Sequence, residues 1–160
     1  MQCDLEQIVR EHGDMVLRLA VAQTGNRADA EDVFQEVFIR LVRSLDKIED
    51  EDHLRHWLVR ATINRCKSLF ASAHRKRELP VEEFPEAGER PFDDVADTPA
   101  TDALQGLPEK YRAPLHLFYF EGLSISDIAK VLESSEGTVK SQLSRGRRML
   151  GQSLKEASHV

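Results

Sequence analysis

Apolar residues recur at intervals of three and four along most of this chain, which is the spacing of one face of an α-helix. Asn26, with Asp29 three residues on, is suited to capping a helix N-terminus. The pattern that follows predicts one long helix over residues 27–47. Its apolar stripe consists of Phe34, Val37, Phe38, Leu41 and Leu45. The opposite face is suited to solvent or to a protein partner and consists of Asp32, Gln35, Ile39 and Arg43.

A second helix is predicted over residues 53–75, after an acidic turn at 49–52. Its expected core face consists of Leu54, Trp57, Leu58 and Ala61. A further row follows helical spacing and consists of Arg60, Asn64, Lys67 and Ala71. Cations contact phosphates, and an amide offers both a donor and an acceptor to a base edge. The row therefore suits a nucleic acid, although on charge alone a solvated helix face fits at least as well.

The C-terminal part carries the pattern of a helix-turn-helix. Ser124 and Asp127 have the spacing of a capping box. The short helix after Ser124 has an apolar face of Ile125, Ile128, Ala129 and Leu132, and a polar turn at 133–135 follows. The next helix is expected to bury Val139, Leu143, Gly146 and Leu150. Its outer face then consists of Lys140, Ser141, Ser144, Arg145 and Arg148, which is typical of a recognition helix.

A supporting helix is predicted to begin at Leu107 and Pro108, since proline is favoured in a first helical turn. Pro114 lies inside this helix and is expected to kink it, because its nitrogen carries no hydrogen. The helix is expected to supply core residues Leu115, Leu117, Phe118 and Phe120.

Composition and charge support an all-α protein of two small helical domains. The 160 residues are 41% hydrophobic but only 6% aromatic, which suits helices better than β-sandwiches. The net charge of -6 arises in residues 78–102, where one Lys or Arg stands against nine Asp and Glu, with four of the six prolines. This segment is predicted to be a flexible acidic linker between domains at 1–77 and 103–157. Cationic stretches at 53–77 and 137–150 flank it and suit a polyanion.

The sequence contains no apolar run near the roughly 20 residues that a membrane helix needs, and its first residues do not resemble a secretory signal. We therefore expect a cytoplasmic protein without membrane insertion. Cys3 and Cys66 are too few for a disulfide framework. His53 and His56 lie one helical turn apart but have no third ligand, so no metal or cofactor is expected.

Five motifs of this sequence, in this order, resemble those of the extracytoplasmic-function (ECF) sigma factors, compact specificity subunits of bacterial RNA polymerase. The motifs occupy residues 29–40, 57–64, 107–112, 121–129 and 137–141. The resemblance covers most of the chain outside the acidic segment. It implies a transcription factor without enzymatic activity, made of a region 2 helical bundle and a region 4 helix-turn-helix.

The resemblance also implies roles for individual residues. The docking surface for the polymerase clamp helices would consist of Asp29, Asp32, Gln35 and Glu36. Contacts to the minus-10 element, with the turn at 48–55 holding a flipped base, would come from Arg60, Asn64, Lys67 and Arg75. Contacts to the minus-35 element would come from Thr138, Lys140, Ser141, Ser144, Arg145, Arg147 and Arg148. The implied partners are core RNA polymerase, at its clamp helices and flap, promoter DNA and an anti-sigma factor, with a monomer when free.

The sequence departs from the family pattern around the recognition helix. Glu133 and Ser134 occupy turn positions where the family usually has Gly and an aliphatic residue, which predicts a strained turn. Gln142 stands where Arg is common, and Gly146 replaces a usual Ala and allows closer packing.

Two other functions fit parts of the sequence. A stand-alone helix-turn-helix regulator would bind DNA without polymerase, but this function leaves the motifs at 29–40 and 57–64 unexplained. A metal-dependent hydrolase would use Glu51, His53 and His56, an incomplete ligand set.

Overall fold

The computed structural model describes residues 4–77 and 104–158, with the side chains of 73–77 and of several residues after 152 left out. The chain divides into two compact units, residues 1–95 and 96–160. Every regular element of the described ranges is helical, which confirms the all-α prediction. The predicted linker at 78–102 lies outside these ranges, so the predicted domain boundaries stay a prediction.

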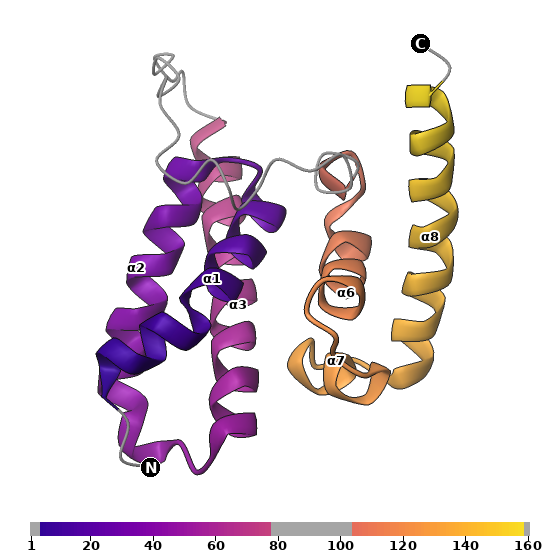
Figure 1. Ribbon diagram of the computed structural model, residues 1–160. Coiled ribbons are helices and arrows are strands. Elements are labelled where there is room, and N and C mark those ends of the chain that lie inside the picture. The colour runs from indigo at the N-terminus through magenta and orange to yellow at the C-terminus, as the bar shows by residue number, and fades with distance from the viewer. Residues whose placement is uncertain (1–3, 78–103, 159–160) are drawn as a thin grey trace. The chain divides into compact units, whose positions relative to one another are not determined.

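In the first unit, α1 (Leu5–Thr24) packs against both α2 (Arg27–Ser44) and α3 (Glu51–Arg77), as Figure 1 shows. A short 3-10 turn, η1 (Leu45–Lys47), continues α2. The Asn26 side chain accepts a hydrogen bond from the Asp29 N–H at 3.2 Å, so the predicted cap is confirmed. Gly25 before it has φ 68, a backbone conformation that favours glycine, and it ends α1.

The core faces of α2 and α3 differ from those predicted. On α2 the fully buried residues are Ala30, Val33, Val37 and Leu41, while Phe34 and Leu45 are half-buried. On α3 the buried residues are Leu54, Leu58, Val59, Thr62, Ile63 and Cys66. Trp57 and Ala61 are only half-buried. The reason is that α3 contacts both α1 and α2, so the helix face that lies in the core differs from the predicted one.

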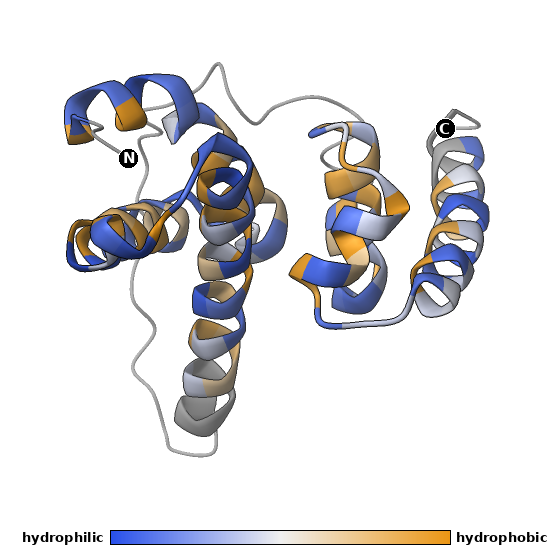
Figure 2. Cartoon of the chain, turned by 90° about the horizontal axis from the view of Figure 1, so that it is seen from below, coloured by the Kyte–Doolittle hydropathy of each residue, from blue (hydrophilic) through white to orange (hydrophobic). Residues whose placement is uncertain are grey.

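In the second unit, α6 (Glu109–Tyr119) and the short α7 (Ile125–Val131) both pack on α8 (Glu136–Ser158). Ser124 caps α7 by accepting from the Asp127 N–H at 3.1 Å, as predicted. The central apolar residues are Leu115, Leu117, Ile128, Val139 and Leu143. In Figure 2 apolar and polar residues alternate along the helices of each unit, as expected for helices with one apolar side.

The predicted supporting helix begins after Pro108, continues through Pro114 and buries Leu115 and Leu117. Phe120, which was predicted to lie in the core, is 40% exposed, and Phe118 is half-buried. The reason is that α6 ends at Tyr119, so Phe120 leaves the helix face that packs on α8.

Glu133 in the turn of the helix-turn-helix has φ 55, a left-handed backbone conformation that strains a residue with a side chain. The strain predicted for this turn is therefore present. We expect Glu133→Gly to raise the free energy of unfolding of the second unit by about 1 kcal/mol, because glycine adopts this conformation without the Cβ clash.

Chemical denaturation of the two proteins would measure this difference. Glu136→Gly, at the first residue of α8, is the matched control and should destabilise the unit, because helical backbone gives glycine no such advantage. Equal losses of unfolding free energy in the two variants would contradict the assignment of strain to Glu133.

None of the described helices is both long and apolar enough to cross a membrane.

Candidate polymerase and nucleic-acid interfaces

The exposed side of α2 combines polar and apolar side chains. Asp32, Gln35 and Arg43 are exposed, as predicted, while Asp29 and Glu36 are half-buried. Glu36 accepts a hydrogen bond from the Arg40 guanidinium at 3.2 Å. Ile39 and Val42 are each 51% exposed, although both are large and apolar.

Val42 was not among the predicted site residues, but its spacing from Gln35 and Ile39 carries a signal. Positions 35, 39 and 42 follow one helical stripe, so these side chains lie on one face of α2. We call Asp32, Gln35, Ile39 and Val42 the α2 face. Exposed apolar residues framed by polar ones are suited to docking a protein partner.

On α3, the predicted row of nucleic-acid contacts is exposed. Arg60, Asn64 and Lys67 all face solvent on one side of the helix. The backbone of Arg75 continues this helix, but its side chain lies outside the described residues. Two cations and an amide are thus presented together on a rigid element, which suits positioning of a phosphodiester chain and hydrogen bonding to a base.

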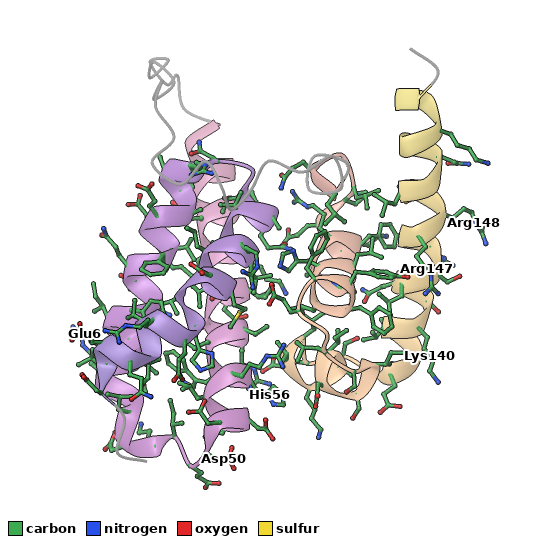
Figure 3. All side chains as sticks on the ribbon, viewed as in Figure 1. Glu6, Asp50, His56, Lys140, Arg147 and Arg148 are labelled. Atoms are coloured by element: carbon green, nitrogen blue, oxygen red, sulfur yellow. The ribbon has the colours of Figure 1, made fainter. Side chains whose placement is uncertain are left out.

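The turn that precedes α3 is held by reciprocal hydrogen bonds. The His53 N–H donates to Asp50 Oδ1 at 2.7 Å, and His53 Nδ1 accepts from the Glu49 N–H at 3.1 Å. Ile48, 2% exposed, anchors the turn in the core. Figure 3 labels Asp50 at this turn. A preformed turn of this kind is suited to holding an unstacked base.

The hydrolase alternative loses support from the same contacts. Nδ1 of His53 accepts a hydrogen bond in this cap, so this nitrogen is not free to bind a metal. Among the described residues, the side chains whose ligand atoms come within 4.8 Å of one another are instead Glu11, His12 and Glu51. His12 Nε2 lies 3.3 Å from Glu51 Oε2, which already forms an ion pair without a metal when His12 is protonated.

All the predicted minus-35 contacts on α8 are exposed. They are Thr138, Lys140, Ser141, Ser144, Arg145, Arg147 and Arg148. Figure 3 shows Lys140, Arg147 and Arg148 along α8. The Thr138 hydroxyl is already engaged, since it accepts from the Ser135 hydroxyl at 2.8 Å in the cap of α8. The described stretch from Gly137 to Leu150 carries four cations and no carboxylate, which suits DNA.

Two tyrosines of α6, which were not predicted as site residues, lie beside arginines of α8. Burial of the Tyr111 ring raises the pKa of its phenol, but the nearby Arg145 and Lys110 outweigh burial, so the net pKa lies below its ordinary value. Tyr119 accepts a hydrogen bond from Arg147 Nη1 at 3.1 Å. The supporting helix therefore helps to orient cations of the recognition helix.

Comparison with known proteins decides the family. The family model for sigma-70 region 2 matches residues 8–76, and that for sigma-70 region 4 matches residues 99–150. The RNA polymerase sigma-H factor of Pseudomonas aeruginosa is 31% identical over 163 residues, covering 92% of this chain and 84% of that protein. The ECF RNA polymerase sigma factor SigE of Mycolicibacterium smegmatis is 38% identical over 159 residues. The chain belongs to the ECF sigma factor family.

This ECF sigma factor spans 59% of the length of SigE, and that match covers 91% of the chain. Its fold is similar to that of the sigma factor RpoE in a co-crystal structure with the anti-sigma factor NepR from Bartonella quintana. The TM-score is 0.76 at 23% identity, with 94% of this chain and 96% of that chain covered. The region 2 match thus includes the α2 face and the exposed row of α3, and the region 4 match includes the exposed face of α8.

Proposed function

We propose that this protein binds core RNA polymerase, recognises minus-10 and minus-35 promoter elements and directs transcription initiation. The observation that carries the proposal is the placement of three exposed faces within the two family matches: the α2 face, the row on α3 and the cationic face of α8. The proposed activity is binding and melting rather than catalysis of a chemical step. The polymerase would supply the catalytic centre, and this chain the promoter specificity.

Region 2 would engage both the polymerase and the minus-10 element. The α2 face, together with Asp29 and Glu36, is the proposed docking surface for the clamp helices. The α3 row would hold the single strand, with Arg60 and Lys67 on phosphates and Asn64 at a base. The turn fixed by Asp50 and His53 lies next to the start of this helix, so a base unstacked by melting could be captured there.

We expect Asn64→Ala to slow promoter opening and to relax minus-10 selectivity, while affinity for core polymerase stays unchanged. Loss of a base-edge contact costs about 1–3 kcal/mol of discrimination, roughly tenfold or more. Permanganate reactivity of unpaired thymines would measure opening, and competition between minus-10 variants would measure selectivity. Reduced core affinity, or an unchanged ranking of minus-10 sequences, would contradict this role.

Region 4 would place α8 in the major groove of the minus-35 element. We expect Lys140→Ala to relax sequence selectivity, because a lysine can hydrogen-bond a base edge. Arg148→Ala should instead weaken binding to all sequences and lower the slope of log affinity against log salt by about one unit.

Titration of matched and mismatched duplexes with the holoenzyme at several salt concentrations would separate these roles. Each variant serves as the control for the other. Identical salt slopes and identical selectivity in both variants would contradict the assignment of Lys140 to a base and Arg148 to a phosphate.

Regulation by an anti-sigma factor is part of the proposal. The similar RpoE structure contains the anti-sigma factor NepR, and two small units allow an inhibitor to cover the polymerase-binding and DNA-binding faces. The protein would act in the cytoplasm as a monomer until it joins the polymerase.

Co-purification with bacterial core polymerase, followed by run-off transcription from a pooled promoter library, would test the function. A stable complex that starts RNA at promoters sharing a two-element motif is the expected result. Binding to duplex DNA without any affinity for core, in the absence of an inhibitor, would favour the stand-alone regulator instead.

A further inference from the structure

Tyr119, the last residue of α6, exposes 52% of its surface although it carries a large aromatic ring. Its neighbour Phe120 is 40% exposed, and the Tyr119 hydroxyl lies against Arg147 of the recognition helix. The predicted minus-35 contacts all lie on α8 and do not account for the exposure of Tyr119. An exposed phenol that is hydrogen-bonded to an exposed arginine presents to solvent donors from which a phosphate could accept hydrogen bonds.

The position of Tyr119 is fixed from several sides. Its ring meets Phe118 edge-on, with centroids 5.0 Å apart and an interplanar angle of 80°. Phe120 stacks on His116 at 5.2 Å, and His116 Nε2 lies 3.2 Å from Glu121 Oε1 in a buried pair. These contacts hold the end of α6, so the Tyr119 hydroxyl is presented at a defined place.

The hydrogen bond between Tyr119 and Arg147 leaves both groups able to bind an anion. Arg147 Nη1 donates to the phenol oxygen at 3.1 Å, and the phenol hydrogen therefore remains available for donation to another acceptor. The guanidinium carries five N–H donors, only one of which this bond uses. A phosphodiester offers acceptor oxygens and a negative charge, which match a hydroxyl and a guanidinium side by side.

We propose that Tyr119 and Arg147 form one phosphate-binding pair for the DNA backbone, with Tyr119 both a direct donor and the residue that positions Arg147. The inference rests on the proposed binding of α8 to promoter DNA. Lys140, Ser144 and Arg147 follow one helical stripe, so the pair continues that stripe from α8 onto α6. A backbone contact carries no sequence information, so the pair contributes equally to every sequence.

The test uses the full chain assembled with core polymerase. Affinities are measured for a duplex with the preferred minus-35 element and for one with that element scrambled. Tyr119→Phe keeps the ring and its edge contact with Phe118 but removes the hydroxyl. We expect it to weaken binding to both duplexes by about the same factor, roughly tenfold or more, since it removes one hydrogen bond to a charged group. Arg147→Ala should weaken both duplexes further.

A double variant and a structural control complete the design. If the two residues act as a unit, adding Tyr119→Phe to Arg147→Ala should reduce DNA affinity little further. The unfolding midpoint of Tyr119→Phe should stay near that of the unaltered protein, which separates a binding role from a structural one.

Normal DNA affinity of Tyr119→Phe, while Arg147→Ala or Arg148→Ala weakens binding, would overturn the pair and leave the proposed function standing. If the losses of DNA affinity in the two single variants added fully in the double variant, the residues would be two independent contacts, and the proposed pair would also be wrong. If the unaltered protein formed no complex with core and DNA, both the pair and the proposed function would fail.

Discussion

Replacing Ile39 with Glu is expected to lower affinity for core RNA polymerase at least tenfold while the first unit stays folded. Ile39 is 51% exposed and lies on the α2 face between Gln35 and Val42, so its side chain contributes little to the core. In a docked complex it would be desolvated against the partner. Burying a carboxylate there without a cation costs far more than the roughly 1.4 kcal/mol that corresponds to a tenfold loss.

Fluorescence titration of labelled core polymerase would measure this loss. Asp32→Ala combined with Gln35→Ala should also weaken core binding, because the polar side chains of the α2 face frame the apolar centre. Asn64→Ala is the matched control from the same unit and should leave core affinity unchanged. Equal core affinity in all these variants would show that the α2 face is not the docking surface.

Gly146→Ala is expected to destabilise the second unit, although alanine ordinarily favours a helix. A Cβ at Gly146 would lie 2.7 Å from Leu115 Cδ1, 3.2 Å from Leu115 Cγ and 3.3 Å from Tyr111 Cβ. Leu115 is buried, so a shift of its side chain has to be accommodated by packed neighbours. Overpacking costs about 1–3 kcal/mol and the gain in helix propensity is about 1 kcal/mol, so the net loss is up to about 2 kcal/mol.

Gly151→Ala is the matched control on the same helix, because a Cβ there meets no atom within 4 Å. It should stabilise the unit or leave it unchanged. The difference in stability between the two variants therefore measures the cost of crowding between α6 and α8. Trp57, the single tryptophan, reports on the first unit, while both tyrosines lie in the second. A tyrosine-detected transition that shifts in Gly146→Ala, with unchanged Trp57 fluorescence, is the expected result. Equal stability of the two variants would contradict close packing at Gly146.

The helical pattern and the capping residues predicted most of the fold. The bonds of Asn26 and Ser124 depend on neighbours only three residues away, so sequence spacing was sufficient to locate them. The exposed faces of α2, α3 and α8 were also found, because charged and amide side chains are costly to bury and therefore mark the outside of a helix.

Core assignments made from one helix at a time were less accurate. Trp57 and Phe120 were predicted to be buried because they are large and apolar, yet one is half-buried and the other exposed. Burial depends on which neighbouring helix covers a residue, and this is not contained in the periodicity of a single segment. Val42 and Tyr119 were missed as surface residues for the same reason.

The sequence by itself therefore determined the helices, their caps, the polar faces and, through the order of its motifs, the family. These properties depend on local backbone preferences and on side-chain polarity, which neighbours along the chain set. Tertiary structure alone decided which side chains crowd Gly146, the exposure of Phe120 and the pairing of Tyr119 with Arg147, which is 28 residues away. Such features arise only when segments distant in sequence pack together, because packing then fixes distances that no local pattern encodes.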